Sequence, residues 1–320
     1  MVIAGRETRD FLNQEGIPCQ TTLQKSGSVE GVGIHSGAPV QVTFHPALEN
    51  TGIVFRRTDV AQEAGDIPAL WHLVKDTRMS TGLVNAQGTG ISMVEHCMAA
   101  VMGLEIDNLV IEVSGPEMPV LDGSSAQYVK VLQGCVLQSQ QAPRRFLKVL
   151  QEVEVRQGDA YVRLSPASQL TLDFSIDFFG GREGLAPQTH HFAWTPGGFL
   201  REIACARTFG FYEDALKLQA AGLAKGASLD NTLVYKEGLV MNEGGERVSQ
   251  ESVRHKILDA VGDLGLAGSP IIGAYTSHNG GHAMNNALLH ALFESEENYT
   301  YDAAAKGPYS TWQPFAAIAI

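Results

Sequence analysis

The sequence predicts an α+β fold of two domains with similar topology, each with helices packed on a β-sheet. Three observations support this prediction. Both halves of the 320-residue chain begin with strand-like segments and continue with a helix, a strand and a second helix. The polar, proline-containing stretch 138–145 lies between the halves and is typical of a linker. The motifs VEHCM at 94–98 and VRHKI at 253–257 place a histidine at the same point of corresponding helices.

The first domain is expected to span residues 21–140. Val40, Val42 and Phe44 alternate with polar neighbours, which is the pattern of a strand with one buried face. The same reasoning predicts further elements in this half: strands at 52–57, 80–85 and 108–113, and helices at 92–104 and 124–135.

The second domain is expected to span residues 145–300. Apolar side chains occupy every second position from 170 to 178, so a strand with one wet face is predicted there. A helix over 250–266, a strand over 270–277 and a helix beginning at His282 follow. Residues 1–20 are interpreted as an N-terminal extension and 301–320 as a C-terminal tail.

Net charge, cysteine spacing and the distribution of apolar residues argue against several classes of protein. The net charge of −12 disfavours a general nucleic-acid binder, which would carry a basic face. The four cysteines are widely spaced and form no C-x-x-C motif, which argues against a thiolate zinc site and a disulfide framework. The N-terminus has no apolar signal region, and no apolar run approaches the roughly 20 residues of a membrane span. We therefore expect a cytoplasmic protein without a transmembrane segment, for which peripheral membrane contact stays open.

The predicted helix over 250–266 carries His255, Asp259 and Asp263 at four-residue intervals. A helix turns about 100° per residue, so the three side chains lie on nearly one face. One interpretation is a solvated ion pair that contributes a few tenths of a kcal/mol. The other is a metal site, in which His255 and Asp259 supply two ligands and His96 from the first half supplies a third. Two His and one carboxylate suit Zn²⁺, and also Fe²⁺.

Glu95 directly precedes the proposed ligand His96, which suits a base that activates metal-bound water. A competing interpretation comes from Ser92–Glu95, which matches the S-x-x-E capping box, in which the glutamate bonds the first backbone amide of the helix. The local sequence favours neither interpretation over the other.

His282 lies between a glycine pair and a predicted helix, and an imidazole suits a general acid because its pKa lies near neutrality. Asp263, one helical turn beyond Asp259, is the candidate that orients it. His278 lacks the preceding glycine pair and ranks lower, and His35 is a rival metal ligand in a predicted hairpin. Together these residues favour a metal-activated water, a carboxylate base and a cationic acid acting on an acyl or amide carbon.

Several motifs resemble the UDP-3-O-acyl-N-acetylglucosamine deacetylase family, and the resemblance covers residues 21–295. The motifs are VEGVGIHSG, NTGIVFRRTD, SMVEHCMAAVMGLEIDNLVIEVSGPEMPVLDGSSAQYV, ARTFGF, SVRHKILDAVGDL and GGHAMNNALL. The resemblance implies a zinc enzyme that removes acetate from the sugar nitrogen in the committed step of lipid A biosynthesis. It also implies a monomer of two α+β domains with the active site at the domain interface.

The resemblance assigns roles to individual residues. The zinc ligands correspond to His96, His255 and Asp259. The catalytic residues correspond to Glu95 as general base, His282 as second catalytic group, Asp263 as its partner and Thr208 as hydrogen-bond donor to the oxyanion.

Substrate contacts are assigned in the same way. Lys256 would meet the charged nucleotide portion, and Phe209 would line the substrate site. Met79 lies in a loop that varies in such enzymes and is interpreted as a substrate-binding position. A β-α-β insert near 208–245 would shape a hydrophobic passage for the acyl chain. Four apolar residues of the insert could form the passage wall, although we expect ordinary core packing for most of them: Phe211, Leu216, Leu218 and Leu223.

Two alternative functions remain at this point. A zinc amidohydrolase or peptidase of other specificity would use the same residues without an acyl passage. A nucleotide-sugar binding protein would need no base beside a metal, so the combination of Glu95, His96 and His282 argues against it.

Overall fold

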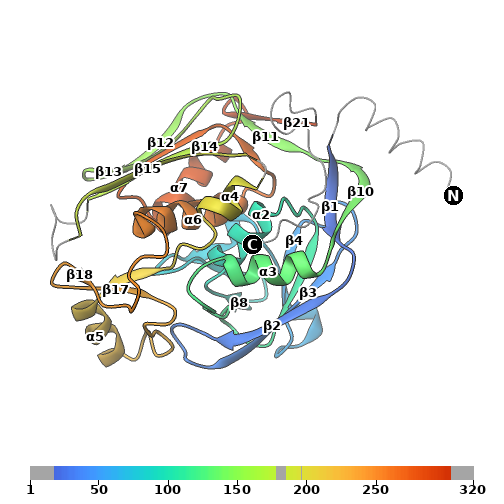
Figure 1. Ribbon diagram of the computed structural model, residues 1–320. Helices are drawn as coiled ribbons and strands as arrows, with labels where there is room; N and C mark the ends of the chain where they lie inside the picture. Colours follow the sequence, from blue (N-terminus) through green and yellow to red (C-terminus); the bar gives the residue numbers. More distant parts are fainter. Residues whose placement is uncertain (1–17, 178–184, 196, 304–320) are drawn as a thin grey trace.

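The computed structural model describes residues 18–177, 185–195 and 197–303. Helices occupy the middle of the molecule, between two larger β-sheets (Figure 1). The expectations for the N-terminal extension and the C-terminal tail fall mainly on 1–17 and 304–320, which lie outside the described residues, as does Phe178 at the end of a predicted strand. Among the described residues, no helix is both long and apolar enough to span a membrane.

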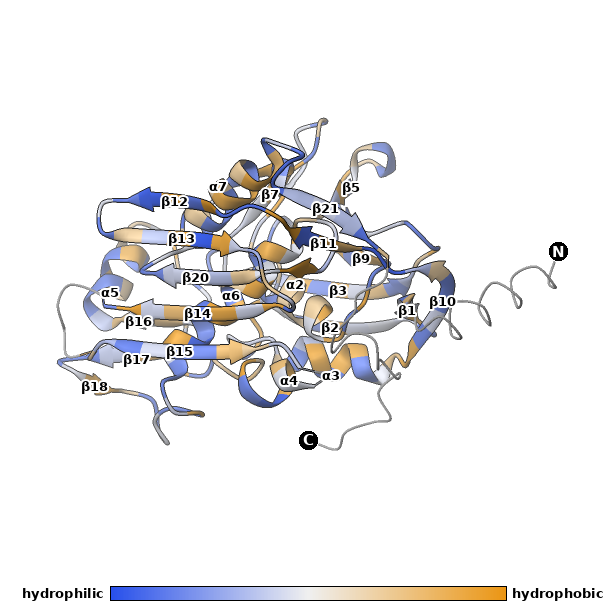
Figure 2. Ribbon diagram, turned by 90° about the horizontal axis from the view of Figure 1, so that it is seen from above, coloured by the Kyte–Doolittle hydropathy of each residue, from blue (hydrophilic) through white to orange (hydrophobic). Residues whose placement is uncertain are grey.

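Two five-stranded sheets share one topology. The first has the strand order Gly27–Val32 (β2), Pro39–Pro46 (β3), Leu109–Val113 (β9), Ile53–Arg57 (β4) and Asp66–Pro68 (β5). The second has the order Val153–Gln157 (β12), Ala160–Ser165 (β13), Ala274–His278 (β20), Thr171–Ile176 (β14) and Gln188–Ala193 (β15), seen from above in Figure 2. In both, the third and fourth strands of this order are parallel, and all other neighbours are antiparallel. The predicted α+β fold with an internal repeat is confirmed.

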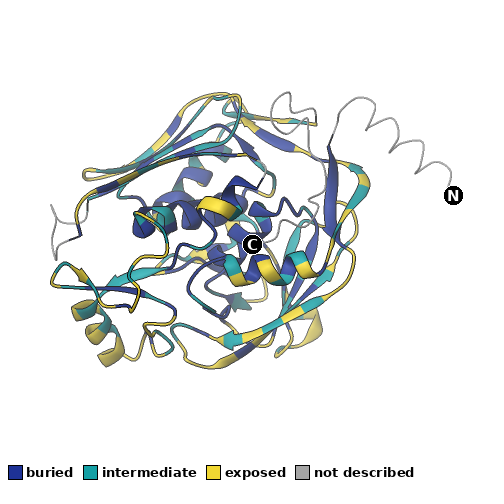
Figure 3. Ribbon diagram, viewed as in Figure 1, coloured by how far each residue is buried: buried dark blue, intermediate teal, exposed yellow. Residues whose placement is uncertain are grey.

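The helices follow the same repeat. Helix α2 (Glu95–Gly103) and helix α3 (Ala126–Gly134) belong to the first half, and α6 (Glu251–Gly265) and α7 (His282–Phe293) to the second. Helix α3 packs on β2, α6 on β14 and β15, and α7 on β12 and β13. Helices α2 and α6 pack against each other in the centre and are buried along nearly their whole length (Figure 3). A short helix, α4 (Gly198–Glu202), lies beside them.

Glycine allows α2 and α6 to approach closely. A Cβ atom on Gly262 would lie 2.1 Å from the backbone oxygen of Glu95, and one on Gly265 would lie 2.7 Å from Cγ of Met102. A larger residue at Gly262 would therefore force the helices apart, and one at Gly265 would displace the Met102 side chain. The close crossing joins the two halves into one continuous hydrophobic core.

The polar stretch 138–145, interpreted as a linker between the halves, contains most of strand β10 (Leu137–Pro143). This strand pairs antiparallel with β1 (Cys19–Leu23), so the connection between the halves has regular structure. The polar side chains of β10 form hydrogen bonds with neighbouring groups. Gln140, for example, donates to the Ala47 carbonyl and accepts from the side chain of Asn108. Polar residues are compatible with a strand when one face of the sheet stays in solvent.

The remaining strands form three small sheets. Strands β6 (Val74–Asp76), β7 (Gly82–Val84) and β8 (Gly90–Ile91) form one, and β11 (Phe146–Val149) joins β19 (Ile271–Ile272) and β21 (Tyr299–Asp302) in another. The third contains β16 (Phe209–Phe211), β17 (Leu233–Lys236) and β18 (Leu239–Val240). Two short 3₁₀ helices span Gln62–Ala64 and Trp71–Leu73.

The segment in which a β-α-β insert was expected contains β16, helix α5 (Tyr212–Ala220) and β17, with the two strands parallel. Helix α5 has no buried residue and stands at the edge of the molecule (Figure 3). Leu216 and Leu223 are exposed, and Phe211 and Leu218 are half-buried. The expectation that most of these side chains pack as ordinary core is therefore wrong, because α5 packs on the small sheet of β16 and β17 and buries none of its residues.

Candidate metal centre and catalytic site

The chemistry-bearing residues of the two halves meet where α2 crosses α6. Helix α2 begins with Glu95 and His96, and α6 carries His255, Asp259 and Asp263 on one face. All five side chains are buried. The interpretation of the α6 face as a solvated ion pair is therefore wrong.

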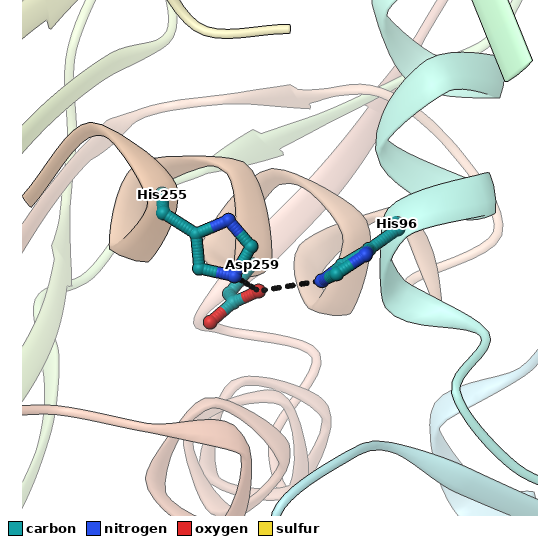
Figure 4. A group of neighbouring side chains, drawn as sticks. All are labelled: His96, His255 and Asp259. Atoms are coloured by element: carbon teal, nitrogen blue, oxygen red, sulfur yellow. Dashed lines mark ion pairs between the residues drawn. The ribbon is translucent and has the colours of Figure 1, made fainter. Parts of the chain in front are cut away.

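Three of these side chains converge on one point (Figure 4). Oδ1 of Asp259 lies 3.2 Å from Nε2 of His255 and 3.7 Å from Nε2 of His96. One ligand atom from each residue can be chosen so that all lie within 4.8 Å of one another. In the part of the chain that the structure describes, this group alone has the arrangement of a metal site.

The protonation states of the cluster fit a cation. Burial lowers the pKa of His255, and it lowers the pKa of His96 to about 3, so both rings are neutral at pH 7. Nδ1 of His255 donates to the carbonyl of Ala206, 3.0 Å away, which leaves the lone pair of Nε2 facing Asp259. Burial opposes ionisation of Asp259, but neighbouring imidazoles and Lys256 lower its pKa well below the usual value.

Oδ1 of Asp259 is buried and accepts no hydrogen bond from any residue that the structure describes. The lone pair on Nε2 of His255 and this carboxylate oxygen point at one another and repel unless a positive ion lies between them. The donor set of two His and one Asp therefore fits a bound divalent metal ion, with the ring of His255 oriented by its backbone partner as in metal sites generally.

Glu95 faces this cluster and does not cap its own helix. The residue before α2 makes no side-chain capping bond, and Oε2 of Glu95 instead accepts the backbone N–H of Thr81 at 2.9 Å. Burial raises the pKa of Glu95 to about 7. The capping-box interpretation is therefore wrong, and the carboxyl group has the pKa of a general base near neutrality.

His282 starts helix α7 and is held by Asp263. Its Nδ1 donates to Oδ2 of Asp263 at 2.9 Å, and its Nε2 lies 4.0 Å from Asp259. Burial lowers the pKa of His282, but the charge of Asp263 and this hydrogen bond outweigh it and raise the pKa to about 9. The imidazole is therefore a cation at neutral pH, as a general acid requires.

A cavity of about 360 Å³ opens beside these groups. Its lining contains every residue assigned a metal-binding, catalytic or substrate-binding role except Asp263, which lies behind His282: Met79, Glu95, His96, Thr208, Phe209, His255, Lys256, Asp259 and His282. Phe211 and Leu218 of the insert also line it. The cavity thus combines a few polar groups with an apolar wall, which is the usual composition of a small-molecule binding site.

Several positions differ from what the sequence suggested. Lys256 lines the cavity, but its Nζ pairs with Oδ2 of Asp259 at 2.7 Å. His35 also lines the cavity without joining the metal-type cluster, and His278 bonds Ser175 on the second sheet. Sequence reasoning missed Thr81, because no spacing connects a residue in an irregular segment with partners on two helices.

The buried His–His–Asp cluster, the adjacent carboxyl group and the imidazolium define a metal enzyme on an α+β fold of two matching sheets. Residues 20–294 match the LpxC family, described as UDP-3-O-acyl N-acetylglycosamine deacetylase. The chain belongs to this family, as its motifs suggested.

Known relatives agree with this assignment. The chain is 42% identical to UDP-3-O-acyl-N-acetylglucosamine deacetylases of Haemophilus influenzae (strain 86-028NP) and Pasteurella multocida (strain Pm70). Each match extends over 282 residues, 88% of this chain and 92% of the relative. The enzyme of that name from Vibrio parahaemolyticus is 40% identical over 303 residues, 94% of this chain and 99% of the relative.

Proposed function

We propose that this chain hydrolyses the N-acetyl group of UDP-3-O-(3-hydroxyacyl)-N-acetylglucosamine, giving the free amine and acetate, in the committed step of lipid A biosynthesis. One observation carries the proposal: the metal-type cluster, the Glu95 carboxyl group and the His282 imidazolium share one cavity with the apolar wall of the insert. The names of the relatives and the family support the substrate.

The metal in this proposal is Zn²⁺ held by His96, His255 and Asp259, with Fe²⁺ as the alternative that the same ligands accept. When bound there, zinc would lower the pKa of a water molecule and polarise the acetamide carbonyl. The neutral imidazoles and the ionised carboxylate supply the ligand states that such an ion needs.

The chain's own groups would move the protons. Glu95, with a pKa of about 7, would accept the proton of the water that attacks the acetamide carbon. The hydroxyl of Thr208 would donate a hydrogen bond to the oxygen that becomes negative in the transition state. His282, protonated at neutral pH, would donate a proton to the departing nitrogen, because an amine leaves poorly without one.

The remaining cavity residues would bind the substrate. Lys256 would meet the anionic nucleotide portion, and Phe209 and Met79 would contact the sugar and the acyl chain. Phe211 and Leu218, half-buried on the cavity wall, would line the acyl passage.

We also propose that the chain forms two domains, 21–140 and 145–300, with an insert near 208–245, and that it acts as a monomer. The shared topology of the two large sheets supports the division. The monomer is supported because the proposed ligands, base, acid and cavity wall all come from one chain.

The direct test measures metal content and acetate release from this substrate for the wild type beside Asp259→Ala. The control is Asp159→Ala, which removes an exposed carboxylate in the turn between β12 and β13. We expect one equivalent of metal and acetate release in the wild type and the control, and loss of both in Asp259→Ala.

Three results would contradict the proposal. Full metal content and activity in Asp259→Ala would show that Asp259 is not the third metal ligand. Equal turnover of simple acetamides or peptides would favour the general amidohydrolase, and substrate binding without acetate release would favour the nucleotide-sugar binding protein.

A further inference from the structure

Thr81, between β6 and β7, contacts two carboxyl groups that come from different halves of the chain. Its backbone N–H donates to Oε2 of Glu95 on α2 at 2.9 Å. Its hydroxyl donates to Oδ1 of Asp263 on α6 at 2.6 Å. Thr81 is 2% exposed, so water does not compete for either bond.

The hydroxyl completes the environment of Asp263. Oδ2 of this carboxylate accepts from Nδ1 of His282 at 2.9 Å and from the side-chain amide of Asn285 at 2.8 Å. Asn285 is itself fixed, because its oxygen accepts the hydroxyl of Tyr275 at 2.7 Å. Thr81 is the donor that the structure gives to the other oxygen, Oδ1, among the described residues. Without it, the carboxylate would keep both remaining donors on one oxygen and would be free to rotate.

The backbone around Thr81 is shaped for this double contact. Met79, two residues earlier, has φ of 66°, a left-handed conformation that a non-glycine residue adopts at a cost. Such strain persists where surrounding contacts hold the segment in place. The β-branched side chain of threonine also has few rotamers, so its hydroxyl direction is set by the backbone.

We propose that Thr81 is a positioning residue, which fixes the proposed base Glu95 and the proposed acid His282 relative to each other through Asp263. This inference rests on the proposed function, because it takes the roles of Glu95 and His282 from there. The peptide N–H of Thr81 orients the base, and its hydroxyl orients the carboxylate that holds the imidazole. One residue of the first half thereby sets the geometry of a pair that spans both halves.

The experiment compares Thr81→Val, which keeps the shape and loses the hydroxyl, with Thr81→Ser, which keeps the hydroxyl. Loss of a partner in the shell behind a catalytic group typically lowers activity by about 10–100-fold. We expect Thr81→Val to lower kcat by that factor with KM within twofold of wild type and metal content unchanged. Thr81→Ser should recover most of the lost kcat.

A double variant tests whether Thr81 acts through Asp263. In an Asp263→Asn background, adding Thr81→Val should lower kcat by less than twofold, because the effects of residues that act as a unit do not multiply. If Thr81→Val yields no folded protein, Thr81→Cys replaces it, since a thiol is a weak donor of similar size to the serine hydroxyl.

Three outcomes would overturn the inference. They are a kcat within twofold of wild type in Thr81→Val, a Thr81→Ser variant as slow as Thr81→Val, and full multiplication of the two effects in the double variant.

A wild type that releases no acetate would instead defeat the proposed function. The inference then depends on the ¹H and ¹⁵N resonances of Nδ1–H in His282, measured on histidine-labelled protein. A changed resonance in Thr81→Val supports positioning through Asp263, and an unchanged one refutes it.

Discussion

The close crossing of α2 and α6 makes Gly262 the most informative position to enlarge. In Gly262→Ala the new Cβ would lie 2.1 Å from the backbone oxygen of Glu95 and 2.8 Å from its carbonyl carbon. Ordinary contacts of this kind begin at 3.4 Å, so the helices must separate by about 1 Å or more. Both partners of the clash are backbone atoms, so no side-chain rotation can relieve it.

The separation would act on the metal cluster as well as on stability. His255 and Asp259 both belong to α6 and would move together, whereas His96 belongs to α2 and would move away from them. Metal–ligand distances tolerate changes of only about 0.2 Å. We therefore expect metal affinity to fall at least about tenfold. Overpacking should lower the free energy of unfolding by about 1–3 kcal/mol.

The assay is metal affinity by chelator competition, together with urea unfolding of the metal-free protein. Gly134→Ala is the matched control, since Gly134 ends helix α3 and is exposed, and the new methyl group would have no atom of the described residues within 4 Å. Alanine there should be neutral or stabilising by up to about 1 kcal/mol. Wild-type metal affinity and stability in Gly262→Ala would refute the argument that this crossing holds the three ligands together.

Four further predictions concern the proposed chemistry. Glu95→Gln should keep its metal and lower kcat by about 10²–10⁴-fold, and loss of the metal in this variant would make Glu95 a ligand instead of a base. His282→Ala should also lower kcat by orders of magnitude with metal bound, and near-full turnover at neutral pH would disprove its acid role. Because Glu95 must be ionised and His282 protonated, kcat/KM should rise with pH through about 7 and fall above about 9, and a flat profile between pH 6 and 10 would contradict both assignments. Thr208→Val should lower kcat about 10²–10³-fold with little change in KM, whereas a change in KM alone would indicate ground-state binding.

Local periodicity along the chain was enough to predict several elements and part of the site. Alternation predicted the strand Thr171–Ile176, and apolar spacing predicted α2 and α6. The i, i+4 spacing of His255 and Asp259 placed both on one helix face before any fold was considered. The matching positions of His96 and His255 in the repeat indicated that the two histidines could meet.

The surroundings of these groups depend on elements that are distant in the chain and meet on folding. The pKa of Glu95 depends on burial, and that of His282 depends on burial together with a partner 19 residues away; neither is encoded in spacing. Polarity predicted a linker where β10 pairs with β1, and hydrophobicity predicted core packing for an insert helix that has no buried residue. The two contacts of Thr81 are seen only in the folded structure, where its irregular segment packs against two helices. A pattern along the chain reports which face of an element is apolar, whereas partners, desolvation and charge depend on which elements pack together.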